Sequence, residues 1–321
     1  MIGLRRAFAL ILVAALTATG CSRAAERPVV PPSSAATPTL SPAPTARRTA
    51  GGIDKVLIIA EENHGYGQII GAAQAPYLNR LADTYGTATH LDAGYPAGCP
   101  SLAAYILLTS GSTAGICDDK GPRAHPLRDD NVFHQVAAAG GEWRVYAESA
   151  PGFCALHNSA DGRYLVRHVP VTYYLNDRAD CPRWAVPLGT PAAGALHHDV
   201  AAGTLPAFGF VSPDACNDMH GAGPCPGGRV AAGDDWLQSL IPSILEGPDY
   251  RAGRLVVITW DEGTRTDNHI PTVVIAPATR HVVAEAPFTH CSILRTVEEL
   301  LHLPLMGCAA HASSMVAAFH L

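Results

Sequence analysis

Several acidic and amide side chains stand directly after apolar runs, where together they could bind a metal ion. Glu62 and Asn63 follow KVLIIAE, Asp261 and Glu262 follow LVVITW, and Asp214 follows FGFVSP. Carboxylate and amide oxygens are hard ligands that suit Ca²⁺, Mg²⁺ or Mn²⁺. Acidic side chains brought together repel one another unless a cation lies among them, so the pattern predicts one divalent metal ion. Taken singly, each pair also fits a helix cap or a solvated turn.

A candidate nucleophile stands in GYPAGCPSLAAYILLTSG, residues 94–111. Ser101 precedes an apolar helical run that ends at Gly111, so we expect it at a helix N-terminus, where free N–H groups and the helix dipole favour a phosphate or an alkoxide. A side-chain cap of that helix is the alternative role. A metal ion nearby would lower the pKa of the hydroxyl and favour the nucleophilic role.

A polar loop, SPDACNDMHG at residues 212–221, carries Asp218 and His220. A histidine among carboxylates can transfer protons or contact phosphate near neutral pH. Solvated loop residues are the alternative.

The remaining pattern predicts the elements that would position these groups. Apolar runs alternate with helical patterns, which favours an α/β fold with a largely parallel sheet. In such sheets a ligand site lies beyond the carboxyl ends of the strands. The expected strands are 55–60, 143–147, 207–211, 254–260 and 272–276, and the expected helices are 75–85, 101–110, 131–139, 234–246 and 290–302.

The first 52 residues are expected to serve export rather than folding. Residues 1–20 combine two arginines, the apolar run AFALILVAAL and small residues before Cys21, which is typical of a signal peptide. LTATGCS resembles a bacterial lipoprotein signal, in which Cys21 is the lipidated mature N-terminus; ordinary secretion is the alternative. Residues 21–52, rich in Pro, Ala and Thr, predict a disordered tether. The folded domain is expected to cover residues 53–321, on a cell-surface lipoprotein or a secreted protein.

Cysteine content supports an exported protein. Of nine cysteines, eight remain if Cys21 carries lipid, enough for up to four disulfides in an oxidising compartment. Cys216 with Cys225 and Cys291 with Cys308 are reasonable pairs by their closeness in sequence, although pairing cannot be deduced from sequence alone.

The net charge of the domain disfavours two classes of binding partner. The first 52 residues hold six of the 22 basic residues and one of the 28 acidic ones, so the rest of the chain has a net charge of −11. This charge disfavours nucleic acids and anionic membrane surfaces. We expect a monomer that meets a membrane only through a lipid on Cys21.

Six separated elements, in order, resemble the bacterial phosphoesterase family that contains phosphatidylcholine phospholipases C and secreted acid phosphatases. That family combines an ENH element, a P-S/T-x-P-N-Y segment, a V-x-P-x-x-x-N-D-M-H element, a G-D-x-W-L helix start, a W-D-E strand end and an S-x-L-R-T-x-E helix. The counterparts are EENH (61–64), CPSLAAY (99–105), VSPDACNDMH (211–220), GDDWL (233–237), TWDEG (259–263) and THCSILRTVEELLHLP (289–304).

The resemblance implies an alkaline-phosphatase-like α/β sandwich with a central, largely parallel sheet flanked by helices. Ser101 would attack phosphorus and form a covalent intermediate, His220 would contact phosphate or protonate the leaving oxygen, and Asp218 would orient His220. His168, in YLVRHVPVTYY, is either a second phosphate contact or a structural histidine. Both histidines are expected to be charged at acid pH. The implied metal ligands are Glu62, Asn63, Ser101, Asp261 and Glu262.

The sequence departs from the family pattern near the nucleophile. Ala103 and Ala104 replace the usual Pro-Asn, and Cys99 replaces a usual histidine. Loss of the asparagine removes a phosphate donor, which would cost about 2–4 kcal/mol of transition-state stabilisation if nothing replaces it. The resemblance implies a metal-dependent secreted acid phosphatase that acts on phosphomonoesters. The expected substrate is a small-molecule or lipid-headgroup phosphate ester, with phosphatidylinositol phosphates among the candidates. A phospholipase C-type phosphodiesterase and a pseudoenzyme that only binds a ligand are the alternatives.

Overall fold

A buried aliphatic strand forms the centre of the sheet in the computed structural model, which describes residues 52–96, 98–221, 225, 229–264 and 266–321. The strand, β1 (Lys55–Glu61), is buried at every position after Lys55, as expected for a strand covered on both faces. The described residues lie in the second of two units of the chain, Arg48–Leu321. The predicted signal peptide, the lipidated Cys21 and almost all of the tether lie outside the described residues.

The described strands and helices follow one another along the chain as α/β units. The other strands are β2 (Gly86–Ala88), β3 (Leu91–Asp92), β4 (Trp143–Ala147), β5 (Ala185–Pro187), β6 (Phe208–Ser212), β7 (Arg254–Trp260), β8 (His269–Ile270), β9 (Thr272–Ile275), β10 (Val282–Ala284) and β11 (Phe288–Thr289). The helices are α1 (Tyr66–Ile69), α2 (Pro76–Thr84), α3 (Leu102–Ser110), α4 (Val132–Ala138), α5 (Cys181–Trp184), α6 (Ala195–Ala202), α7 (Arg229–Glu246), α8 (Pro248–Arg251), α9 (His290–Leu300) and α10 (Val316–Phe319), with 3-10 turns at Val166–His168, Pro170–Tyr173 and Gly307–Ala310.

Eight of the described strands form a mostly parallel sheet in the order β10-β2-β9-β7-β1-β6-β4-β5, and β11-β3-β8 form a small second sheet. β1 pairs in parallel with β6 on one side and β7 on the other. Only β9 among the strands of the large sheet runs against its neighbours β7 and β2. The predicted α/β class with a largely parallel sheet is therefore confirmed.

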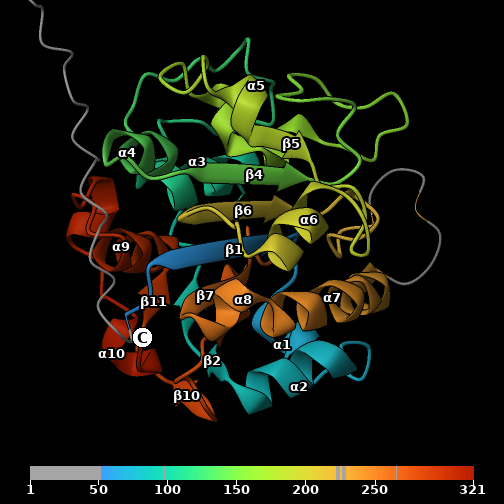
Figure 1. Ribbon diagram of the computed structural model, residues 1–321, viewed down its shortest axis with the longest axis vertical. Helices are drawn as coiled ribbons and strands as arrows, with labels where there is room; N and C mark the ends of the chain where they lie inside the picture. The colour runs from blue at the N-terminus through green and yellow to red at the C-terminus, as the bar shows by residue number, and fades with distance from the viewer. Residues whose placement is uncertain (1–51, 97, 222–224, 226–228, 265) are drawn as a thin grey trace, which may run out of the picture. The chain divides into compact units, whose positions relative to one another are not determined.

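Helices pack on the sheet in two groups. α3 packs against α4 and α9, whereas α7 packs against α2, α6 and α8. Figure 1 shows α7 and α8 in front of the sheet and α3 behind it.

All five predicted strands and all five predicted helices are present, with bounds shifted by at most two residues, except that α7 begins five residues before the predicted start. The elements that the sequence did not predict are mostly two to four residues long, too short for an apolar period to show.

The GDDWL motif proves to be a packing and capping element. Gly233 lets α7 approach the loop that carries Asp218, because a Cβ there would lie 2.4 Å from Met219 Cγ and 2.8 Å from the Asn217 carbonyl oxygen. Asp234 accepts hydrogen bonds from the backbone N–H groups of Tyr77 and Leu78. It thus caps the N-terminus of α2 from another helix, since α2 has no side-chain cap of its own.

We expect Asp234→Ala to lower the free energy of unfolding by about 1–3 kcal/mol, because the N–H groups of Tyr77 and Leu78 lose their acceptor. The adjacent, exposed Asp235 provides the control: Asp235→Ala should change stability by less than about 0.5 kcal/mol. Urea unfolding of both variants gives the comparison. Equal stability losses in the two variants would show that Asp234 is not a cap.

The described residues contain four disulfides. Cys216–Cys225 and Cys291–Cys308 confirm the two predicted pairs, and Cys99–Cys117 and Cys154–Cys181 complete the set. Together the four bonds fit an oxidising compartment. No helix in the described part of the chain is both long and apolar enough to cross a membrane.

Candidate active site

The candidate site lies where the carboxyl ends of β1 and β7 meet. Glu61 and Trp260 are partners in the parallel ladder, and the N–H of Asp261 continues it by donating to the Glu61 carbonyl oxygen at 3.0 Å. Glu62 and Asp261 therefore leave neighbouring strands at the same edge. Asn63 adopts a left-handed conformation (φ 50°), and its backbone N–H donates to Asp261 Oδ1 at 3.1 Å.

Four side chains of the site converge on the carboxylate of Glu62. Its Oε2 accepts the Ser101 hydroxyl at 3.1 Å, and its Oε1 accepts the Tyr105 hydroxyl at 2.7 Å. His168 Nε2 lies 3.1 Å from Oε1, and His220 Nδ1 lies 3.4 Å from Oε2. Burial alone raises the pKa of Glu62, but His168, His220 and nearby groups outweigh it and lower the pKa to about 2. Glu62 is therefore a buried carboxylate.

Ser101 is at the start of α3, as predicted, but its side chain does not cap the helix. Its hydroxyl makes no capping bond and instead points to Glu62, and the residue is only 2% exposed. The cap is supplied by Asp119, whose Oδ1 accepts the N–H of Leu102 at 3.1 Å. The N–H groups of Ala103 and Ala104 donate to backbone carbonyl oxygens, so the prediction of free N–H groups at this helix start is wrong. The hydroxyl of Ser101 is thus committed to the acidic cluster, which favours the chemical role over the structural alternative.

His168 fits the structural alternative better than the phosphate contact. It is 2% exposed and stacks on the ring of Tyr105 at 5.2 Å between centroids. Burial lowers the pKa of His168 to about 3 against the opposing influence of Glu62. The expectation that His168 is charged at acid pH is therefore wrong, because an imidazole with that pKa is neutral at pH 5.

His220 is the most open of the four predicted catalytic residues, with a side chain 28% exposed. Asp218 does not hold it as predicted: Asp218 Oδ1 accepts the backbone N–H of His220 at 2.9 Å, while Oδ2 lies 3.7 Å from His168 Nδ1. The backbone carbonyl oxygen of Asp218 also accepts the N–H of Glu62 at 2.8 Å. Asp218 therefore shapes the loop and fixes it to the end of β1.

Asp214 does not join the site, although it too follows a strand. Its Oδ2 accepts Arg163 Nε at 2.7 Å and the Ser149 hydroxyl at 2.6 Å, and its Oδ1 accepts the Cys216 N–H at 2.9 Å. An arginine thus neutralises this carboxylate, and the predicted third acidic strand end is a structural ion pair.

The donor chemistry of the remaining carboxylates fits a cation. Asp261 is 1% exposed, and its Oδ2 is buried without a hydrogen-bond partner. Burial, Glu62 and Glu262 together raise the pKa of Asp261 well above its usual value. The Asn63 amide oxygen faces the same carboxylates, as an oxygen ligand of a shared cation would; in the swapped orientation its nitrogen donates to Glu262 Oε1 at 3.1 Å and Asp261 Oδ1 at 3.2 Å instead. Mutual repulsion and an unpartnered oxygen are what a hard cation would relieve.

As arranged, no three His, Cys, Asp or Glu side chains within the described residues form a complete metal site. Three of the predicted ligands are acidic: Glu62, Asp261 and Glu262. The other two, Asn63 and Ser101, would contribute neutral oxygens. Metal binding thus stays a prediction.

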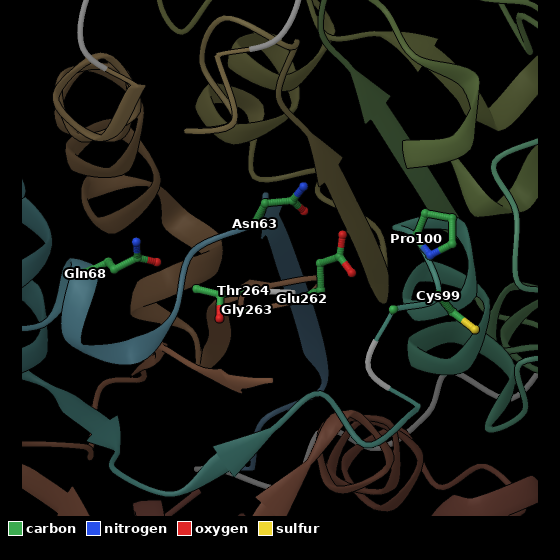
Figure 2. A pocket seen from close by; sticks show the side chains of 8 residues that line it. Asn63, Gln68, Cys99, Pro100, Glu262, Gly263 and Thr264 are labelled. Atoms are coloured by element: carbon green, nitrogen blue, oxygen red, sulfur yellow. The ribbon is translucent and has the colours of Figure 1, made fainter. Parts of the chain in front are cut away.

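A pocket of about 570 Å³ opens beside the cluster. Figure 2 shows Asn63 and Glu262 on one side of it and Cys99 and Pro100 on the other. The lining residues are Asn63, Gln68, Gly98, Cys99, Pro100, Glu262, Gly263 and Thr264. Pro100, which precedes the candidate nucleophile, and two predicted metal ligands therefore face a space large enough for a small phosphate ester.

Four side chains at the site escaped the sequence analysis. Tyr105 donates to Glu62, and Tyr95 donates to Glu262 Oε2 at 2.8 Å. Asp119 caps α3, and its Oδ2 lies 3.2 Å from Arg167 Nε. Only Tyr105 had a signal in the sequence, the tyrosine that ends the P-S/T-x-P-N-Y segment.

Comparison with known proteins gives consistent results. Residues 72–304 match the sequence model of the Phosphoesterase family. The phosphatidylinositol-3-phosphatase of Mycobacterium tuberculosis is 29% identical over 260 residues, 80% of each chain. An acid phosphatase of Aspergillus fumigatus is 24% identical over 233 residues, 68% of this chain and 50% of that protein. A protein of the alkaline phosphatase superfamily from Vibrio parahaemolyticus shares the fold, with a TM-score of 0.53 over 84% of this chain and 72% of that one at 10% identity.

Proposed function

The chain belongs to the phosphoesterase family and is a phosphoric ester hydrolase, and we propose on that premise that it is an exported, metal-dependent acid phosphatase that forms a phosphoserine intermediate. One observation carries the proposal: the Ser101 hydroxyl, at the start of α3, donates to the buried carboxylate Glu62 at the carboxyl edge of the sheet. A serine held this way is placed for nucleophilic attack rather than for capping.

The chain's own groups supply most of the proposed chemistry. Glu62 holds the Ser101 hydroxyl and takes its proton as the serine oxygen bonds to phosphorus and the ester oxygen leaves, and it returns that proton when water releases the phosphate from the serine. His220, the half-buried histidine beside Glu62, protonates the leaving oxygen and then removes a proton from the water that hydrolyses the phosphoserine. Buried Tyr105 holds the carboxylate of Glu62 in place through its hydroxyl, and His168 packs beside the same carboxylate oxygen.

The divalent ion would be held by Glu62, Asn63, Ser101, Asp261 and Glu262. When bound, it would neutralise the carboxylates and lower the pKa of the serine hydroxyl. Its hard oxygen ligands suit Ca²⁺, Mg²⁺ or Mn²⁺.

Phosphomonoesters are the proposed substrates, with phosphoinositide headgroups among them. The name of the mycobacterial relative states that it acts on phosphatidylinositol 3-phosphate, and the names of two further relatives state acid phosphatase activity. A cell-surface lipoprotein anchored through Cys21, or a secreted protein, would meet such esters outside the cell. A phospholipase C-type phosphodiesterase is the second candidate, because the family contains both.

We expect kcat/KM to be higher for p-nitrophenyl phosphate than for p-nitrophenylphosphorylcholine between about pH 5 and pH 7. A monoester carries an additional anionic oxygen, which His220 and the metal ion would stabilise. The two substrates release the same chromophore, so the ratio reports only the phosphate group. A higher value for the choline diester would replace the phosphatase with the phospholipase C, and hydrolysis of neither would leave a pseudoenzyme.

A further inference from the structure

One short segment, Cys117–Asp119, holds the chain on both sides of Ser101. Cys117 forms a disulfide with Cys99, two residues before the serine. Asp119 Oδ1 accepts the N–H of Leu102, the residue directly after it, at 3.1 Å. The backbone around the candidate nucleophile is therefore fixed by a covalent bond on one side and a hydrogen bond on the other.

An ion pair connects this segment to the rest of the site. Asp119 Oδ2 lies 3.2 Å from Arg167 Nε, and the Arg167 side chain is only 17% exposed. Arg167 directly precedes His168, whose Nε2 lies 3.1 Å from Glu62 Oε1. Glu62 in turn accepts the Ser101 hydroxyl. The contacts thus close a ring that starts and ends at the serine.

The stretch before Ser101 needs such support. Gly98 has a φ of 97°, and residues 93–100 contain no helix or strand in their described part. Cys99 and Pro100 also line the pocket, where one side of the chain faces no packed element. A reacting hydroxyl must be held to within a fraction of an ångström, and a displacement of about 1 Å costs about a hundredfold in rate.

We propose that Cys117–Asp119 is a clamp that positions the Ser101 hydroxyl, with the Cys99–Cys117 disulfide and the Asp119 hydrogen bond as its two grips. The proposal rests on the assignment of Ser101 as the nucleophile. Cys99 then has a role of its own at a position where the family usually has a histidine: it contributes backbone rigidity. Asp119 and the two cysteines are positioning residues, because they act through Ser101 and its neighbours.

The disulfides provide a matched control for the first grip. Cys99–Cys117 and Cys291–Cys308 have sequence separations of 18 and 17 residues, so their loss should lower the melting temperature by similar amounts. We compare the full-length double variants Cys99→Ser/Cys117→Ser and Cys291→Ser/Cys308→Ser on p-nitrophenyl phosphate. Only the first should lose kcat, by about tenfold or more, while KM changes less than about threefold. Equal loss of kcat in the two variants, or loss in neither, would overturn the clamp.

The second grip is tested by two substitutions at one position. Asp119→Asn keeps an oxygen that can accept the Leu102 N–H, whereas Asp119→Ala removes it. We expect kcat to fall at least about fivefold more in the alanine variant than in the asparagine variant. Equal kcat values would show that the hydrogen bond does not position the serine.

Hydrogen exchange separates this proposal from the proposed function. Amides in a peptide spanning residues 99–105 should exchange faster in Cys99→Ser/Cys117→Ser than in the control pair, whether or not the protein turns over a phosphate ester. An inactive wild type would refute the phosphatase assignment while this measurement still decides the clamp. Unchanged exchange in that peptide would refute the clamp in an active enzyme.

Discussion

Ser101→Ala is expected to lower kcat on p-nitrophenyl phosphate by about a thousandfold or more, with little loss of stability. The substitution removes the oxygen that would attack phosphorus. It also removes a hydrogen bond to Glu62, which contributes about 1 kcal/mol to stability. For a domain of this size that corresponds to a melting temperature lower by about 2–4 °C. Activity and stability should therefore separate widely.

Ser110, at the other end of α3, is the matched control. It is 5% exposed, and its hydroxyl donates to the Ile106 carbonyl oxygen at 2.8 Å. Ser110→Ala should lose about as much stability as Ser101→Ala and keep its turnover. Acid quenching during turnover should in addition trap phosphate on a wild-type peptide containing Ser101. A Ser101→Ala protein that retains more than about a tenth of the wild-type kcat would exclude the serine as nucleophile.

The strand ends that carry the site could be predicted because they are local features of the sequence. An apolar run followed by polar residues defines both the end of β1 and the end of β7, and parallel pairing then brings Glu62 beside Asp261. The position of Ser101 could be predicted in the same way, because Ser101 directly precedes an apolar helical run. These predictions needed only the run of residues and the general rule that ligands bind at the carboxyl edge of such a sheet.

The partners of these groups could not be predicted, because they come from distant parts of the chain. Asp214 follows a strand just as Asp261 does, but Arg163, 51 residues earlier, neutralises it. Nothing in the local sequence around Asp214 distinguishes the two cases. Asp119 accepts a hydrogen bond from Leu102, 17 residues earlier in the chain, and pairs with Arg167, 48 residues later.

The protonation of His168 shows the same limit. The histidine was expected to be charged at acid pH from its usual pKa, but complete burial lowers that pKa to about 3. Burial depends on the whole fold, since His168 lies in a 3-10 turn that packs against α3. Residue type therefore indicated which side chains could act, and only the packing showed which ones can carry charge.

Removal of one acidic ligand should have the second large effect. We expect Asp261→Asn to weaken metal binding by about tenfold or more and to lower turnover accordingly, because the site loses an anionic oxygen that the ion would need. The asparagine keeps an oxygen for the Asn63 N–H, so the strand end should stay in place. Elemental analysis of the purified proteins measures occupancy, and exhaustive chelation should abolish wild-type turnover.

Asp214→Asn is the matched control, since Asp214 is also a buried carboxylate beyond a strand of the same sheet. It should keep its metal content and lose stability, because Arg163 loses a charged partner.

The melting temperature of Asp261→Asn gives a second test, because its difference from the wild type should change sign between the metal-free and the metal-saturated protein. In the metal-free protein the substitution should raise the melting temperature, because it removes one of several buried carboxylates that repel one another. In excess metal the wild type should melt higher than the variant, because the ion binds the folded wild type more tightly. Asp214→Asn should melt below the wild type in both conditions, because its effect does not depend on the ion. Full metal occupancy in Asp261→Asn, or wild-type turnover that survives exhaustive chelation, would remove the metal ion from the proposed site and leave Glu62 alone to orient the serine.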